Sequence, residues 1–106
     1  EYTAGPVFMS AESKGSHEWL IEFDKQPSDL VQFTETLDEV LKSVNSDYEA
    51  KRHKDLNLVM PVVRALPKDT FNKWLISKNK FGGQNKVPRL SNSRDYIEEL
   101  YIIANI

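Results

Sequence analysis

Apolar side chains recur with a period of two in one part of the chain and with a period of three to four in others. The period of two is clearest over 17–23 and predicts a strand there. Its two faces carry, in turn, Trp19, Ile21 and Phe23, and Glu18, Leu20 and Glu22. Short apolar runs at 7–9 and 58–66 predict two further strands. Because Pro61 lies inside the last run, we expect that strand at a sheet edge or with a bulge.

The helical period is clearest after residue 27, where Ser28 is the expected N-cap and Asp29 suits the positive end of the helix. The predicted buried stripe of this helix consists of Leu30, Phe33, Leu37, Val40, Leu41 and Val44. Residues 45–47 interrupt the stripe. They are expected to cap a second, shorter helix that runs through Tyr48 and Arg52.

Two more helices are expected in the second half of the chain. Residues 67–69 precede a helix that carries Phe71, Trp74 and Leu75. Asn92, followed by Asp95, is expected to cap the last helix, whose stripe is Ile97, Leu100 and Ile103 or Ala104. The tryptophans and phenylalanines lie on apolar stripes, and we expect them in the core.

The order of these elements predicts an α+β fold, a small mixed β-sheet with helices packed on one face as a two-layer sandwich. Residues 7–9 and 17–23 are expected to pair as a hairpin. Parallel pairing across the first long helix would be right-handed. At 106 residues the chain is expected to form one domain, 1–106.

Composition narrows the possible environments of the chain. It has no cysteine, which excludes disulfides, thiolate zinc sites and cysteine nucleophiles and is compatible with the reducing cytoplasm. No apolar run approaches the roughly 20 residues of a membrane helix, and we predict no membrane partner. The chain begins with Glu1 instead of Met, as expected of a piece excised from a larger protein.

Charge is distributed unevenly although the net charge is only -2. Residues 1–50 carry a net charge of -8, residues 51–94 carry +9 and residues 95–106 carry -3. A basic stretch of this kind creates a field that attracts phosphate groups or an acidic surface. In the other interpretation the fold interleaves the segments and the fields cancel.

The most unusual stretch is 81–89. Gly82 and Gly83 permit close backbone approach, Lys86 supplies a flexible point charge, and Arg89 offers a planar fork for oxyanions. Such a loop suits contact with phosphate or carboxylate groups, whereas a solvated surface loop is the alternative. The phosphate-binding loop pattern is absent, because Lys86 is followed by valine instead of serine or threonine.

Three ordered motifs resemble a known family. Residues 84–89, Gln-Asn-Lys-Val-Pro-Arg, resemble the Gln-x-Lys-x-Pro-Arg signature of the auxin-responsive Gretchen Hagen family of acyl acid–amido synthetases. Asn45, Tyr48 and Arg52 resemble its Asn-x-x-Tyr-x-x-x-Arg, and Arg64 with Thr70-Phe71 resembles its Arg-Val-Val-x-x-Gly-Thr-Phe. Residues 1–6 and 17–21 look like the bacterial members. Asp69 departs from the family's glycine, and Asn85 from the tyrosine of plant members.

The resemblance implies the C-terminal lid domain of an adenylate-forming ligase. A missing N-terminal domain would bind ATP, Mg²⁺, a carboxylic acid and an amino acid, and the lid would close over the site. The implied catalytic residue is Lys86. Residues implied to touch the nucleotide or position the loop are Gln84, Arg89, Gly82 and Gly83. Tyr48 and Arg52 are expected to be structural or to lie at the domain interface, and the fragment alone is expected to be inactive.

The main alternative is a free-standing α+β module that binds a ligand or nucleic acid without catalysis. Nucleic acid is not favoured, because the basic segment lacks the aromatic pattern of a base-stacking platform. His17 and His53 do not have the spacing of a metal pair, so no metal site is predicted. We interpret Glu18 and Glu22 as an exposed sheet face instead of a catalytic carboxylate pair.

Overall fold

The computed structural model describes residues 1–8, 14–55, 58–78 and 87–106. Within these ranges the strands are β1 (Tyr2–Val7), β2 (Ser16–Ile21) and β3 (Val62–Ala65). The α-helices are α1 (Leu30–Val44), α2 (Ser46–Arg52), α3 (Thr70–Ser77) and α4 (Asp95–Ala104), and a short 3-10 helix, η1, spans His53–Asp55. No helix in these ranges is long and apolar enough to cross a membrane.

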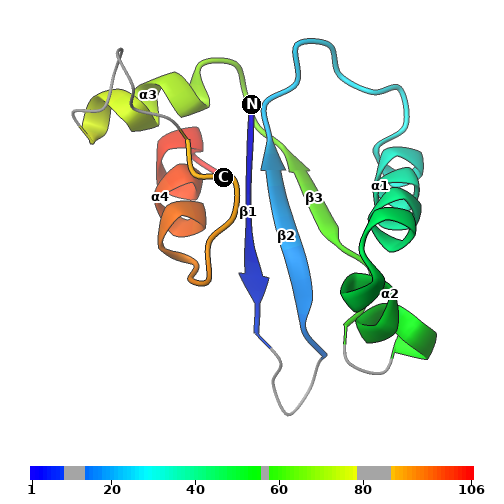
Figure 1. Cartoon of the computed structure of the whole chain (residues 1–106). Coiled ribbons are helices and arrows are strands. Elements are labelled where there is room, and N and C mark those ends of the chain that lie inside the picture. The colour runs from blue at the N-terminus through cyan, green and yellow to red at the C-terminus, as the bar shows by residue number, and fades with distance from the viewer. Residues whose placement is uncertain (9–13, 56–57, 79–86) are drawn as a thin grey trace.

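The three strands form one mixed sheet in the order β1-β2-β3 (Figure 1). β1 pairs with β2 antiparallel, and β2 pairs with β3 parallel. The α+β class, the mixed sheet and the pairing of the first two strands are confirmed. β3 is an edge strand, and Pro61 lies directly before it.

The first strand was predicted at 7–9, which overlaps β1 only at Val7. The position of this strand was therefore predicted wrongly. The strand includes Gly5-Pro6, which sequence rules read as a break. Pro6 is tolerated because β1 is an edge strand of the three-stranded sheet and proline lacks only a backbone donor. A Cβ at Gly5 would lie 2.7 Å from Cδ1 of Ile97 on α4 and 3.2 Å from the Ser93 carbonyl oxygen, so these neighbours would have to shift to admit a larger residue.

The hydrophobic core lies between the sheet and the α3–α4 pair. Leu20 of β2 is fully buried against these two helices, where Trp74 of α3 meets Tyr96 of α4 edge to face. The buried members of the cluster are Leu20, Leu66, Phe71, Trp74, Val87, Ile97 and Leu100. The predicted stripes of α3 and α4 are therefore confirmed at their central residues.

The core lies on the face of β2 that sequence analysis had assigned to exposed carboxylates. Glu18 shares that face with Leu20 and is only 4% exposed, so its interpretation as a solvated residue is wrong. Trp19 points to the opposite face and is half-buried instead of lying in the core. Both faces of β2 carry apolar residues, so the alternation alone did not indicate which face the helices cover.

The helices are divided between the two sides of the sheet. α3 and α4 lie on one side, whereas α1 and α2 lie on the other, beside β3 (Figure 1). The ring of Tyr48 in α2 stacks on His17 of β2, with centroids 5.9 Å apart. His17 and Leu20 point to opposite faces of β2, so helices pack on both faces of the sheet. The prediction of helices on one face accounts only for α3 and α4.

α1 differs from its prediction in its cap and in its buried face. Asp29, not Ser28, is the N-cap, and its side chain accepts a hydrogen bond from the Gln32 N–H at 3.1 Å. Val40 and Val44 of the expected stripe are exposed, and the buried residue of this helix is Asp38. The cap of α2 is confirmed, because Asn45 accepts from the Tyr48 N–H.

The start of α4 was also predicted wrongly. The helix begins at Asp95 and its N-cap position is Arg94, which makes no side-chain cap hydrogen bond. Asn92 lies three residues earlier and is not the cap. The hydroxyl of Ser93 instead accepts a weak hydrogen bond from the Asp95 N–H at 3.4 Å.

Asp69, which stands where the resembled motif has glycine, has a left-handed backbone conformation. Asp69 precedes α3 with φ 69° and makes no capping hydrogen bond through its side chain. The carboxylate of Glu22 accepts the backbone N–H groups of Asp69 and Phe71 at 3.0 and 3.1 Å and so caps α3 in its place. A left-handed conformation is strained for most residues and free of strain for glycine.

We therefore expect Asp69→Gly to raise the free energy of unfolding by about 0.5–1 kcal/mol, because the strain relieved exceeds the extra chain entropy of glycine. Urea denaturation followed by circular dichroism measures the change. Lys68→Gly is the control, since φ is not positive at Lys68, and it should destabilise the protein. A destabilised Asp69→Gly protein would contradict the prediction.

Candidate functional site

Residues 87–89, the part of the signature segment that the structure describes, are held by the core and by β1. Val87 is buried in the hydrophobic cluster with Leu20 and Trp74. The next residue, Pro88, accepts a hydrogen bond through its carbonyl oxygen from the hydroxyl of Thr3, at 2.6 Å. Thr3 itself is almost completely buried. Val87 and Pro88, near the end of the signature segment, are therefore held in place by the core and by Thr3.

Backbone hydrogen bonds to β1 continue this attachment over residues 89–91. The N–H of Ala4 donates to the Arg89 carbonyl at 2.9 Å, and the N–H of Ser91 donates to the Ala4 carbonyl at 3.0 Å. Residues 89–91 thus line the outer edge of β1, where Leu90 forms an isolated parallel bridge with Ala4. Sequence analysis had no signal for this strand-like pairing.

The Arg89 side chain is turned towards β1. It forms an ion pair with Glu1, donates to the Tyr2 carbonyl at 3.3 Å and lies over the Tyr2 ring at 4.7 Å from the centroid. Half of the side chain remains exposed. The guanidinium is therefore partly occupied by contacts within the domain.

The other residues predicted from the signature, Lys86, Gln84, Gly82 and Gly83, lie outside the described residues. The last described residue before them is Lys78, just after α3, whose ammonium pairs with Glu99 of α4 at 2.7 Å. The first described residue after them is Val87. Both flanking residues are thus attached to the α3–α4 side of the domain.

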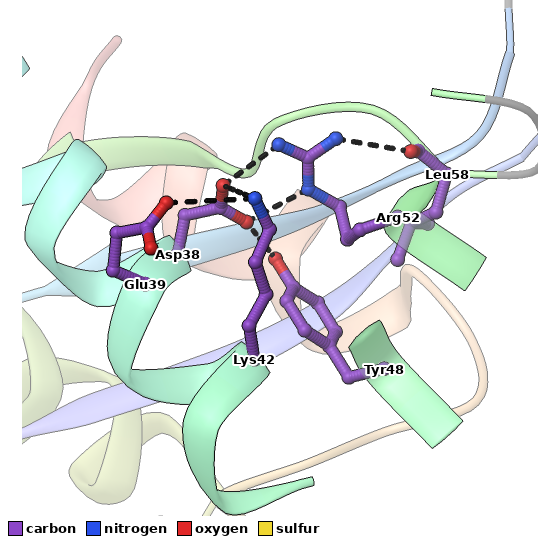
Figure 2. A network of polar contacts seen from close by, with 6 residues as sticks. All are labelled: Asp38, Glu39, Lys42, Tyr48, Arg52 and Leu58. Carbon is purple, nitrogen blue, oxygen red and sulfur yellow. Dashed lines mark hydrogen bonds and ion pairs between the residues drawn. The ribbon is translucent and has the colours of Figure 1, made fainter. Parts of the chain in front are cut away.

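Tyr48 and Arg52 meet at a carboxylate that sequence analysis did not single out. Figure 2 shows both side chains directed at Asp38 of α1. The Tyr48 hydroxyl donates to Asp38 Oδ1 at 2.6 Å. Arg52 binds the same carboxylate in bidentate fashion, from Nε to Oδ1 at 2.8 Å and from Nη2 to Oδ2 at 2.7 Å.

Two further groups complete this buried network. Lys42 of α1 reaches Asp38 Oδ2 at 3.3 Å and also pairs with Glu39 (Figure 2). Arg52 donates through Nη1 to the Leu58 carbonyl at 3.2 Å, which ties α2 to the segment that leads into β3. Asp38, Tyr48 and Arg52 are all buried, so their polar groups depend on one another and not on water.

The network shifts the proton affinities of its members. The hydrogen bond from Arg52 holds the pKa of the Asp38 carboxyl well below its usual range, and outweighs the opposing effect of burial. Burial, and then the hydrogen bond to the Asp38 carboxylate, raise the pKa of Tyr48 far above its usual value. At neutral pH the group is therefore a fixed carboxylate between a guanidinium and a neutral phenol, which suits a structural link better than proton transfer.

Two of the three resembled motifs lie entirely within the described residues. Tyr48 and Arg52 converge on one buried carboxylate, and Thr70 and Phe71 are buried at the start of α3. The model of the GH3 family C-terminal domain matches residues 1–95, which is most of the chain. The chain belongs to this family. A comparison with curated proteins finds no match.

The matched part of the GH3 C-terminal domain ends where α4 begins, at Asp95. α4 nevertheless supplies Ile97 and Leu100 to the core. Belonging to this family places the chain within a multidomain acyl acid amido synthetase, with an N-terminal domain in the same polypeptide. Within the described ranges, no group of three or more histidine, aspartate or glutamate residues is arranged to hold a metal ion.

A second buried carboxylate lies between two arginines of the GH3 domain. Glu18 accepts from Arg94 Nη1 at 2.9 Å, and Arg64 of β3 lies 3.6 Å from its other oxygen. Arg94 also donates to the Pro6 carbonyl and pairs with Glu98. The arginine of the third motif, Arg64, thus borders a structural ion pair on the sheet edge and remains more than half exposed.

The hydrogen bond from the Thr3 hydroxyl holds Pro88, near the end of the signature segment, against β1. We expect Thr3→Val to lower the free energy of unfolding by about 1–2 kcal/mol, because it leaves the Pro88 carbonyl without its partner. Thr3→Ser should recover most of the loss. Thermal denaturation followed by circular dichroism measures both.

Thr34→Val on α1 is the control for this prediction, because the Thr34 hydroxyl donates to a carbonyl of its own helix, at 2.8 Å. That carbonyl keeps its backbone partner, so we expect a change below about 0.5 kcal/mol. Equal losses for Thr3→Val and Thr34→Val would show that the Pro88 contact contributes nothing specific.

Proposed function

We propose that this GH3 C-terminal domain acts as the lid of an ATP-dependent acyl acid–amido synthetase and that Lys86 is its catalytic residue. The observation that carries the proposal is the family match over residues 1–95 together with the Gln-x-Lys-x-Pro-Arg signature at 84–89. The enzyme would join a carboxylic acid to an amino acid. It would form the acyl-adenylate and pyrophosphate first, and the amine would then displace AMP to give the amide.

The attachment of residues 87–91 supports this proposal. A lysine that acts on a nucleotide bound by another domain must be presented from a fixed base, because misplacement of a catalytic group by about 1 Å can cost about 10²-fold in rate. Val87, the residue after Lys86, is buried in the core, and Pro88 is bound by Thr3. The two residues that follow Lys86 in the sequence are thereby held against the core and β1.

The residues of this domain supply binding and positioning, and the nucleotide and Mg²⁺ would be bound mainly by the N-terminal domain. Mg²⁺ supplies charge neutralisation at the phosphates when bound. Gln84, Gly82 and Gly83 are proposed to contact the nucleotide or shape the loop. Arg89 is proposed to position the loop instead, since its guanidinium already contacts Glu1 and Tyr2. Closure of the domain would keep water from the hydrolysable adenylate.

Two finer assignments belong to the same proposal. Residues 1–6 and 17–21 resemble the bacterial members of the family. The absence of cysteine from the chain fits the reducing cytoplasm, where we propose the enzyme works.

The test is ATP–pyrophosphate exchange by the intact protein in which this domain occurs. The exchange is measured with Mg²⁺ against a panel of carboxylic acids, and amide products are then sought by mass spectrometry with a panel of amino acids. Exchange that depends on one class of acid, followed by amide formation, is the expected result. A protein that binds nucleotide but catalyses no exchange with any acid would favour the binding-module alternative.

A further inference from the structure

Thr3 is a buried polar residue that sequence analysis did not single out. It lies on β1 and is 1% exposed, and its hydroxyl donates to the Pro88 carbonyl at 2.6 Å. Pro88 lies two residues after Lys86 in the signature segment. Thr3 is 85 residues away from Pro88 along the chain, so only the packing of β1 against this segment brings the two residues together.

Backbone pairing with β1 does not hold Pro88. The described backbone hydrogen bonds between β1 and this segment begin at Arg89, whose carbonyl accepts from the Ala4 N–H, and continue at Ser91. Within the described residues no backbone hydrogen bond involves Pro88, and proline has no N–H to donate. The Thr3 side chain therefore supplies a donor that the β1 backbone does not, and it extends the attachment by one residue towards the start of the signature segment.

The two other attachments of this segment differ in kind from the Thr3 hydrogen bond. Val87 is buried in the hydrophobic cluster, and hydrophobic burial is non-directional. The Arg89 side chain is half exposed, where ion pairs contribute little and are screened by salt. The hydrogen bond from Thr3 to Pro88 is short, and its donor is a buried side chain. It is therefore the contact best suited to fix the direction of the chain at Pro88.

We propose that Thr3 is a positioning residue of the ligase reaction, which acts through Pro88 on the placement of Lys86. This inference rests on the proposed function, because it takes Lys86 as the catalytic residue. Val87 alone separates Lys86 from Pro88 in the chain, so a change of direction at Pro88 alters where Lys86 is presented. A misplacement of about 1 Å can lower a rate by about 10²-fold. Because Thr3 is buried, its own hydroxyl is not available to a substrate.

Positioning of this kind predicts a particular kinetic pattern. The Lys86 ammonium is proposed to act on charge that develops in the transition state, so its misplacement lowers kcat and leaves the KM of the carboxylic acid unchanged. Thr3→Val keeps the shape of the side chain and removes the hydroxyl, whereas Thr3→Ser keeps the hydroxyl. The loss in kcat should therefore follow the hydroxyl.

The test is steady-state pyrophosphate exchange by the intact protein, with Mg²⁺ and the carboxylic acid that supports the fastest exchange. We expect Thr3→Val to lower kcat by about 10- to 10²-fold at an unchanged KM for the acid, and Thr3→Ser to recover most of the loss. Circular dichroism confirms that each variant is folded at the assay temperature. Thr3→Ala removes the same hydroxyl from a smaller side chain and serves if Thr3→Val does not fold.

Asp29→Ala is the matched control for loss of stability. It removes the N-cap of α1, on the other side of the sheet, and the loss of a helix cap lowers stability to an extent similar to the loss of a buried hydrogen bond (Figure 1). Its kcat should equal that of the wild-type protein. A similar loss of kcat in Asp29→Ala and Thr3→Val would overturn the proposal, as would an unchanged kcat in Thr3→Val.

A double-mutant cycle tests whether Thr3 acts through Lys86. In the Lys86→Ala protein the ammonium is already absent, so Thr3→Val should lower kcat by no more than about twofold. A loss in that background as large as in the wild-type background would overturn the positioning role. A wild-type protein without exchange would remove the proposed function and this inference together. Exchange that requires Lys86 but not the Thr3 hydroxyl would remove this inference alone.

Discussion

Replacing Asp38 by alanine is expected to lower the free energy of unfolding by about 3–5 kcal/mol, the usual loss when one member of a buried ion pair is removed. The carboxylate is 1% exposed and accepts hydrogen bonds from Tyr48 and Arg52. Without it, Nε and Nη2 of Arg52 and the Tyr48 hydroxyl lose the buried acceptor that they share. Since domains are stable by only about 5–15 kcal/mol, this loss is a large fraction of the total stability.

Urea denaturation at pH 7, followed by circular dichroism, measures this loss. Asp47→Ala is the matched control, because Asp47 pairs with Lys51 at 3.3 Å in a position that is 78% exposed. Exposed pairs of this kind contribute about 0–1 kcal/mol. A loss for Asp38→Ala no larger than that for Asp47→Ala would mean that the network does not stabilise the fold.

The low pKa of Asp38 fixes the pH range in which the network contributes. The carboxyl is more acidic in the folded protein than in the unfolded chain, where its pKa is about 3.9. Its stabilisation is therefore fully present above that value and is lost only as the pH falls below it towards the folded pKa. Measurements at pH 5–8 consequently report the same contribution.

Replacing Lys86 by alanine in the intact protein is expected to lower the rate of pyrophosphate exchange by about 10²–10³, or roughly 3–4 kcal/mol in the barrier. Attack of a carboxylate on the α-phosphate brings anions together, and a positioned ammonium reduces their repulsion in the transition state. The stability of the protein should be unaffected, because lysine side chains are almost never fully buried in a core unless they are paired.

Lys73→Ala is the control for this measurement, since Lys73 is an exposed lysine on α3. It removes the same charge from the same domain and should leave exchange unchanged. Lys86→Arg keeps the charge but not its compact shape, and we expect only partial recovery. Exchange near the wild-type rate in the Lys86→Ala protein would contradict the assigned role.

Local signals in the sequence predicted much of the framework. The alternation at 17–23 overlaps β2 up to Ile21, and the helical stripes at 71–75 and 97–100 lie within α3 and α4. The Asn45 cap of α2 was predicted because an Asn side chain bonds an N–H three residues along, within reach of sequence rules. The family motifs were also visible, because they are fixed by residue type and spacing.

Contacts between distant residues account for what the sequence did not indicate. Asp38 lies ten residues from Tyr48 and fourteen from Arg52, and no local pattern marks it as their partner. The one available signal was an acidic residue set among the apolar positions Leu37 and Leu41. Similarly, Thr3 binds Pro88 across 85 residues.

By itself, the sequence determined most of the segments that become helices and strands, the α+β class and the family, since these depend on periodicity, caps and motif spacing along the chain. Tertiary structure alone decided which face of β2 is buried, where β1 begins, and which charged residues enter the interior. β2 has apolar residues on both faces, so the packing of α3 and α4 on Leu20 made the choice. The burial of Glu18 and Asp38 followed, because each gained an arginine from a distant part of the chain.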